Sequence, residues 1–254
     1  MTGLTHPYWI EAQFRRDEGW DDDAYPFNLP VVRTTQSLKF HPRVTFLVGE
    51  NGSGKSTLIE ALAIAWGFNA EGGSRDHNFS THTNHSPLHR FVRPIRDSRQ
   101  PRPHDGFFLR AESFFNVATY LEQMSSDRQG DRSLHEQSHG EAFFSLFENR
   151  LMGDGLYIMD EPEAALSPSR QLSFLAKLHD LVLARSQLII ATHSPIILGY
   201  PDAWIYQASE HGLERVEYEN TEHYQVTRGF LNRRETFLDI LLEERDDLPP
   251  PRDP

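Results

Sequence analysis

Cysteine is absent from the 254-residue sequence, which excludes disulfide bridges and thiolate metal sites. No run of eighteen apolar residues is present, so no segment is expected to span a membrane, and the N-terminus lacks the basic-then-apolar pattern of a signal peptide. A basic excess is also missing, because the formal net charge is −12. This charge argues against a protein that coats nucleic acid but does not exclude a local basic patch. These absences predict a cytoplasmic protein, and the length suffices for one large domain.

A phosphate-binding loop is the most informative pattern that is present. Residues 49–57 read Gly-Glu-Asn-Gly-Ser-Gly-Lys-Ser-Thr, which fits glycine, four residues, Gly-Lys and then Ser or Thr. A strand-like run precedes the loop and an apolar helical run follows it, as the motif requires. The glycines let several N–H groups point at one anion, and the helix N-terminus adds its dipole. The predicted nucleotide-binding residues of this loop are Gly49, Glu50, Asn51, Gly52, Ser53, Gly54, Lys55, Ser56 and Thr57.

Two adjacent carboxylates follow a second apolar run, residues 155–159. Carboxylates at the exit of a buried strand are costly unless a cation or a catalytic task accounts for them. Lys55 is expected to reach the β- and γ-phosphates of a nucleotide, and Ser56 to bind Mg²⁺ together with Asp160. Glu161 is expected to orient and polarise the attacking water as a general base.

Alternating apolar strands and amphipathic helices predict an α/β fold with a layered, mostly parallel sheet. The predicted strands span residues 44–48, 106–110, 155–159 and 187–192, and the predicted helices span residues 58–65, 113–124, 141–152, 169–184 and 230–244. Short strands are also expected within residues 25–40, and a closing hairpin is expected at residues 203–207 and 213–218. The helix at 169–184 is expected to bury the stripe Leu172, Leu175, Leu178 and Leu181.

The spacing of these elements predicts a single domain over residues 1–254. Its core is expected at about 25–218 and a short insertion at about 67–137. A C-terminal helix and an acidic, proline-rich tail are expected at 228–254. The insertion contains no heptad repeat.

Three further segments resemble the motifs of ABC-type ATPases. Residues 138–141, Ser-His-Gly-Glu, resemble the signature segment, although a histidine replaces a glycine and Glu141 replaces glutamine. Residues 160–167 resemble the Asp-Glu-Pro stretch and the D-loop, with Ser167 where Asp is usual. Residues 189–195 resemble the segment of the switch histidine. The chain thus resembles the small soluble ABC-class ATPases, often described as AAA family ATPases, which are related to SMC-type head domains. It lacks the long coiled coil of SMC heads.

The resemblance implies a P-loop NTPase with an ABC/SMC-head-like core and an ATP molecule held between two head-to-tail protomers. In that arrangement one protomer contributes the phosphate loop, Asp160, Glu161 and His193, and the other contributes Ser138 and Gly140. The catalytic residues are then expected to be Lys55, Glu161 and His193, and the Mg²⁺ ligands Ser56, Asp160 and Glu112. The implied cofactors are ATP and Mg²⁺, and the implied partner is a second copy bound when ATP is present.

Three roles stay open for such an ATPase. The first is a soluble switch that acts on nucleic acid or on a partner protein. The second is the nucleotide-binding subunit of an ABC transporter whose membrane part is another chain. The third is a regulatory ATP sensor with slow turnover.

Several lesser features have two interpretations each. Glu112 stands where the family's Q-loop glutamine lies, and it is expected either to contact Mg²⁺ or the attacking water, or only to cap a helix. Arg110 could pair with a phosphate, but a neighbouring acid is favoured. Tyr25 and Phe27 lie where transporter ATPases place an adenine-stacking aromatic, and packing within the core or an edge strand is favoured for both.

Two clusters and a C-terminal pair complete the candidates. The histidines are expected to be solvated loop residues rather than metal ligands: His77, His82, His85 and His89. The arginines are expected to form a solvated face, with binding to a phosphate backbone or an acidic partner as the alternative: Arg90, Arg93, Arg96, Arg99 and Arg102. His223 and Arg228 are expected only to cap the final helix.

Overall fold

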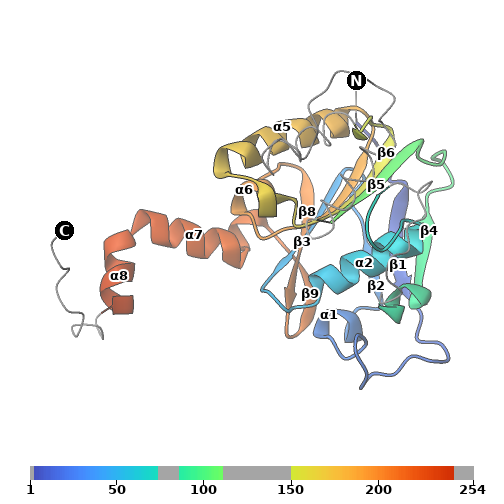
Figure 1. Ribbon diagram of the computed structural model, residues 1–254, viewed down its shortest axis with the longest axis horizontal. Helices are drawn as coiled ribbons and strands as arrows, with labels where there is room; N and C mark the ends of the chain where they lie inside the picture. Colours follow the sequence, from blue (N-terminus) through green and yellow to red (C-terminus); the bar gives the residue numbers. More distant parts are fainter. Residues whose placement is uncertain (1–2, 74–85, 111–149, 243–254) are drawn as a thin grey trace.

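A six-stranded sheet runs through the computed structural model, which describes residues 3–73, 86–110 and 150–242 (Figure 1). The strand order is β5-β6-β7-β3-β8-β9; all neighbours are parallel except β9, which returns antiparallel to β8. The strands are β3 (Val44–Gly49), β5 (Asp105–Arg110), β6 (Gly155–Asp160), β7 (Gln187–Ala191), β8 (Ala203–Ser209) and β9 (Gly212–Val216). Every residue of β3, β6 and β7 is buried, as expected for parallel strands covered on both faces. The predicted α/β class, mostly parallel sheet and closing hairpin are confirmed.

A second, antiparallel sheet has the order β2-β1-β4. Its strands are β1 (Trp9–Phe14), β2 (Ser37–Lys39) and β4 (Val92–Arg96). The sequence did not predict β1 or β4. The prediction of strands throughout 25–40 is partly wrong, because α1 (Pro30–Arg33) forms there; Pro30 occupies the first helical position, where proline favours a helix.

Helix α2 (Lys55–Trp66) lies between the two sheets, so it is buried on most sides. It begins after Gly54 and ends at Gly67, both in the left-handed conformation. The other face of the central sheet is covered by α5 (Pro168–Leu183) and α6 (Pro195–Leu198) (Figure 1).

The predicted helix at 169–184 is confirmed as α5, but its expected apolar stripe is partly wrong. Leu172 is 59% exposed, and Phe174 is buried in its place. Phe174, Leu178 and Leu181 therefore form the face that packs on the sheet. The predicted helix at 113–124 and most of that at 141–152 lie outside the described residues.

The predicted helix at 230–244 is confirmed in part by α8 (Arg234–Leu242), but its start is wrong, because residues 230–232 end a separate helix, α7 (Glu222–Asn232). α7 begins after the buried N-cap Thr221 and ends at Arg233, whose backbone leaves the helical conformation; α8 follows. Neither helix buries a residue within the described chain, and both project from the sheet body (Figure 1). The connecting 3₁₀ helices are η1 (Pro87–Phe91), η3 (Pro162–Ala165) and η4 (Tyr218–Asn220).

No helix in the described part of the chain combines the length and apolar character needed to cross a membrane.

Candidate active site

The candidate site lies where three neighbouring parallel strands end. In the order β6-β7-β3, these strands end at Asp160, Ala191 and Gly49. Ligands of open α/β sheets bind at the carboxyl ends of strands, where the following loops meet. The phosphate loop, the paired carboxylates and the switch-histidine segment are therefore brought together, as their positions in the sequence predicted.

Glycine is required at both ends of the phosphate loop. Gly49 has φ +153°, and a Cβ there would lie 2.6 Å from the carbonyl oxygen of Ala208. Gly54 has φ +93°, and a Cβ there would lie 2.9 Å from a methyl group of Val31. Larger residues would therefore push the loop away from β8 and α1, which hold it against the sheet.

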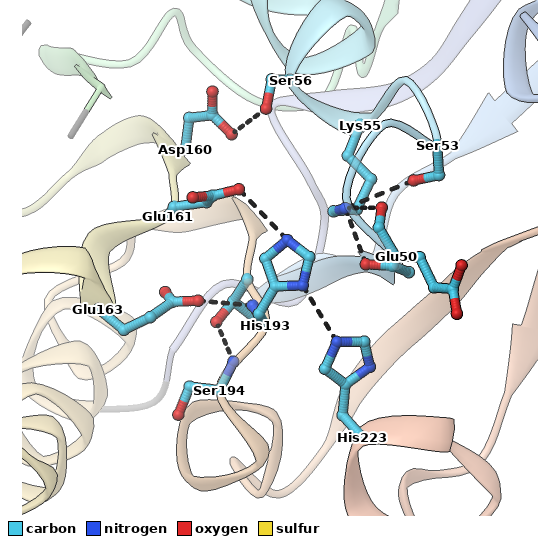
Figure 2. Close-up of polar contacts among 12 residues, drawn as sticks. Glu50, Ser53, Lys55, Ser56, Asp160, Glu161, Glu163, His193, Ser194 and His223 are labelled. Atoms are coloured by element: carbon cyan, nitrogen blue, oxygen red, sulfur yellow. Dashed lines mark hydrogen bonds and ion pairs between the residues drawn. The ribbon is translucent and has the colours of Figure 1, made fainter. Parts of the chain in front are cut away.

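The ammonium group of Lys55 is folded back onto this loop (Figure 2). Its Nζ donates to the carbonyl oxygens of Gly49 and Glu50, each at 2.8 Å, and lies 3.4 Å from Ser53 Oγ. Burial lowers the pKa of Lys55, although the nearby carboxylates of Glu161 and Asp160 oppose that shift. A positive charge is thus kept beside the pocket at an energetic cost.

Ser56 and Asp160 form the second polar contact of the site. Ser56 Oγ donates to Asp160 Oδ1 at 3.3 Å, and Asp160 is almost fully buried. These oxygens are the donors that Mg²⁺ prefers, so the two residues fit this ion. Arg110 donates to Glu60 at 2.6 Å and lies 4.0 Å from Asp160, which confirms that it pairs with neighbouring acids.

Glu161 lies directly opposite the switch histidine. Its backbone is left-handed, with φ 52° and ψ 53°, and its N–H donates to Ala191 O at 2.9 Å. Glu161 Oε1 is 3.3 Å from His193 Nε2. The backbone N–H of His193 donates to Glu163, and burial raises the pKa of Glu163. Glu163 thus anchors the loop that carries His193.

His223 also reaches the site, so the expectation that it only caps a helix is wrong. Its Nε2 lies 3.1 Å from His193 Nδ1, and Figure 2 shows His193 between Glu161 and His223. No motif marked His223. The sequence shows only a histidine in the first turn of a helix, two residues after the N-cap Thr221. That position does not indicate a contact with His193, 30 residues earlier in the chain.

An open pocket of about 390 Å³ adjoins these groups. Its lining residues are Tyr25, Leu29, Asn51, Gly52, Gly54, Lys55, Ser56, Thr57 and Glu161. Tyr25 is 64% exposed and its hydroxyl lies 3.0 Å from Thr57 Oγ1, so the prediction that it packs in the core or against an edge strand is wrong. Phe27 is buried against Trp20 and Phe91, which confirms packing for that residue.

Some of the remaining candidate residues lie within the described residues and others lie outside them. Ser138, Gly140, Glu112 and the histidines at 77, 82 and 85 lie outside the described residues. The Nδ1 atom of His89 lies 2.9 Å from the carbonyl oxygen of Ser86. All five arginines of the 90–102 run are exposed; one of them, Arg96, covers the ring of Trp66 at 4.2 Å, and Arg99 pairs with Asp97.

Comparisons with known proteins agree with this geometry. Residues 28–144 match a family model described as an AAA domain, and no curated protein matches the chain. The structure of cbiO1 from Clostridium perfringens, part of the ABC transporter complex cbiONQ, is 15% identical with a TM-score of 0.51, covering 92% of this chain and 99% of that chain. The SMC head domain from Thermotoga maritima is 18% identical with a TM-score of 0.41, covering 71% of this chain and 93% of that chain. At 15% identity the likeness to cbiO1 shows the fold alone. The family match and the fold confirm the resemblance to ABC-type AAA ATPases.

Proposed function

We propose that this protein binds ATP with Mg²⁺ and hydrolyses it at the pocket beside the phosphate loop. The observation that carries the proposal is the meeting of three strand ends. Ser56 Oγ lies 3.3 Å from Asp160 Oδ1, and Glu161 Oε1 lies 3.3 Å from His193 Nε2. Both contacts adjoin one open pocket. This combination supplies a phosphate cradle, oxygen donors for a cation, and a carboxylate for a water.

Lys55 and the loop amides would bind the phosphates. In the described state Lys55 holds the loop carbonyls, so phosphate oxygens would replace these carbonyls as its partners. Ser56 and Asp160 would hold Mg²⁺, together with Glu112. The chemistry that bound Mg²⁺ supplies is neutralisation of charge on the β- and γ-phosphate oxygens.

Glu161 would act as the general base that orients the attacking water. The hydrogen bond from its own N–H to Ala191 fixes the backbone from which this carboxylate extends. His193 would direct Nε2 toward the γ-phosphate, since this atom already lies on the side of Glu161. Tyr25 would lie against the adenine ring of the nucleotide, because its exposed ring lines the same pocket. Such a ring accepts every base, so the preference for ATP over GTP rests on the resemblance.

Steady-state hydrolysis by wild type and Glu161→Gln tests the proposal. Loss of the base should lower kcat on the order of 10²- to 10⁴-fold. Glu210→Gln is the matched control, because Glu210 is exposed on the β8–β9 turn. Equal rates for wild type and Glu161→Gln, with or without Mg²⁺, would overturn the assignment.

A dimer with ATP between its protomers is part of the proposal. Ser138 and Gly140 of the second copy would close the pocket over the γ-phosphate. Glu161→Gln should then accumulate as a dimer in size-exclusion chromatography with ATP and Mg²⁺, because bound ATP links the protomers until it is hydrolysed. A monomer at all protein and ATP concentrations would contradict this arrangement.

The work that hydrolysis drives is proposed as a switch on nucleic acid or on a protein partner. The five exposed arginines of the 90–102 run favour this role over the others. Stimulation of turnover by DNA or RNA, lost when these arginines are replaced, would support it. Co-purification with a membrane protein would instead indicate a transporter subunit, and slow, unstimulated turnover would indicate a sensor. A cytoplasmic location stays a prediction.

A further inference from the structure

The histidine pair His193–His223 joins two elements that are distant in the chain. His193 follows β7, whereas His223 lies in the first turn of α7, after the chain has passed through the β8–β9 hairpin. The two rings are 5.2 Å apart and tilted by 48°, with His193 Nδ1 and His223 Nε2 at 3.1 Å. That distance requires one nitrogen to donate and the other to accept.

The pKa of both rings is lowered from the ordinary 6.5, which favours their neutral forms at physiological pH. Burial lowers the pKa of His193, and the charge of Lys55 lowers it further, while Glu161 opposes the shift. Burial likewise lowers the pKa of His223; Glu222 and Glu50 oppose this shift and Lys55 adds to it. A neutral imidazole carries a single N–H. The tautomer of His193 therefore determines which nitrogen of His223 carries its proton.

The carboxylate of Glu161 fixes the direction of the pair. Glu161 Oε1 lies 3.3 Å from His193 Nε2 without an aligned hydrogen bond. A carboxylate oxygen attracts an N–H and repels a lone pair, so its proximity favours the N–H of His193 on Nε2. His193 Nδ1 is then an acceptor, and His223 Nε2 must donate to it. His223 Nδ1 is buried and has no hydrogen-bond partner in the described part of the chain, as suits a nitrogen without a proton.

We propose that His223 is a positioning residue that holds His193 in the Nε2–H tautomer with the ring facing Glu161 and the phosphate loop. This inference rests on the proposed ATPase site and adds a residue outside the recognised motifs. His193 Nε2 makes no aligned hydrogen bond within the described residues, although Glu161 is near, so its N–H is ready for an oxygen that enters the pocket. Without His223, Nδ1 would compete for the proton and the ring could turn.

The same contact ties the projecting helices to the site. Thr221 is fully buried; its hydroxyl accepts from the N–H of Tyr224 and donates to Tyr218 O, which fixes the first turn of α7. Tyr218 in turn donates to Pro195 O, next to the His193 loop. His223 is therefore held from its own helix and from α6, as a positioning residue must be.

Nitrogen-15 NMR of the histidine side chains tests the tautomer directly, without any need for hydrolysis. Wild-type His193, identified by the signals that disappear in His193→Gln, should show a protonated Nε2 and a bare Nδ1. His223→Leu should shift these signals toward a mixture of tautomers. His223→Gln, whose amide can still donate to Nδ1, should keep the wild-type pattern. The exposed His211→Leu is the matched control.

Kinetics gives the second readout. His223→Leu should lower kcat about ten-fold with little change in KM, the size found when a partner that orients a functional histidine is removed. His223→Gln should recover most of that loss. A melting curve of each variant separates this effect from misfolding.

An Nδ1–H tautomer in wild type would overturn the inference, and so would unchanged NMR signals in a folded His223→Leu. If His223→Leu and His223→Gln lower kcat equally, His223 contributes only packing and not a hydrogen bond to His193, and the inference again fails. If wild type shows the expected tautomer but hydrolyses no ATP, the proposed function fails while the positioning contact stands.

Discussion

The two ends of the central sheet are built on opposite principles. At the amino end, the buried side chains of Gln187 and Tyr157 find hydrogen-bond partners, although the buried hydroxyl of Ser186 has none in the described residues. At the carboxyl end, Lys55, Glu161, Glu163 and His193 crowd together. Two of their buried atoms, Glu163 Oε2 and His193 Nε2, have no hydrogen-bond partner in the described residues, and burial disfavours the charge of Lys55. Matched networks stabilise a fold, whereas buried, poorly matched charges destabilise it. The comparison teaches that this sheet places its stabilising network at one end and the proposed active site at the other.

Gln187 is the centre of the amino-end network. Its side chain is fully buried, accepts from Trp9 N, and donates to Trp9 O and His41 O at 2.9 and 3.0 Å. It thereby joins the first residue of β7 to β1 of the second sheet and to the segment before β3.

Tyr157 and Asp105 form a second network at this end, between β6 and β5. Tyr157 donates to Asp105 at 2.8 Å and accepts from Gly153 N at 3.0 Å, and Arg150 donates to Asp105 at 3.0 Å. Burial alone would raise the pKa of Asp105, but the bond from Tyr157 and the charge of Arg150 hold it below its ordinary value.

The largest effect on activity is expected from Lys55→Met. Loss of the ammonium should lower kcat/KM on the order of 10²- to 10³-fold, because phosphate charge is no longer neutralised. The melting temperature should stay the same or rise, since burial disfavours this charge. Differential scanning calorimetry beside the ATPase assay measures both, with the exposed Lys39→Met as control. A clear drop in melting temperature would show that the carboxyl end also stabilises the fold.

Gln187→Leu should give the converse result. Trp9 N, Trp9 O and His41 O lose their partner, which should reduce the free energy of unfolding by about 3 kcal/mol. kcat should be unchanged below the melting transition, because the active-site groups among the described residues lie at the opposite end of the sheet. Urea unfolding followed by tryptophan fluorescence measures the loss, and Gln225→Leu on exposed α7 is the control. A fall in kcat with intact stability would contradict the separation.

Tyr157→Phe should reduce the free energy of unfolding by about 1–2 kcal/mol at neutral pH. The pKa of folded Asp105 lies below its ordinary 3.8, so this contribution is present above 3.8 and is lost as pH falls through the folded value. The variant lacks one interaction that lowers this pKa, so its difference from wild type should shrink as the pH falls below 3.8 through the folded pKa. Urea titrations at several pH values measure the difference. A constant difference would mean that the hydroxyl acts through Gly153 instead.

Arg43→Ala should have the smallest effect, although it also lies at the amino end. Arg43 and Asp202 pair on the surface, and such pairs contribute about 0–1 kcal/mol. The free energy of unfolding should change by less than about 0.5 kcal/mol, and added salt should reduce the change further. A large, salt-independent loss would show that exposed pairs share the stabilising role of the buried network.

The sequence predicted the strands that lead into the candidate site. Strands β3, β6 and β7 are fully buried, so each reads as a continuous apolar run, and each ends in a motif with a known physical task. Strand β1 was missed because it is half-buried and includes Glu11 and Gln13, and because its partner β4 lies about 80 residues away. Local patterns carry no information about such a pairing.

The site was predicted only as far as its motifs extend. His223 was missed because it reaches His193 through the return of the chain after the β8–β9 hairpin, which periodicity does not reveal. Tyr25 was assigned to packing because exposure of an aromatic ring depends on neighbours in space. Leu172 was assigned to the core because it shares the helical stripe of Leu175 and Leu178, but it is 59% exposed among the described residues and packs outside the core cluster.

The left-handed backbone of Glu161 has a consequence for how this protein would change under selection. Glycine adopts that conformation without the roughly 1–2 kcal/mol that an L side chain loses there. A library randomised at position 161 and screened only for resistance to proteolysis should therefore be enriched in glycine and asparagine. The most stable descendants would be the ones that had discarded the carboxylate, and only continued demand for turnover would keep it in place.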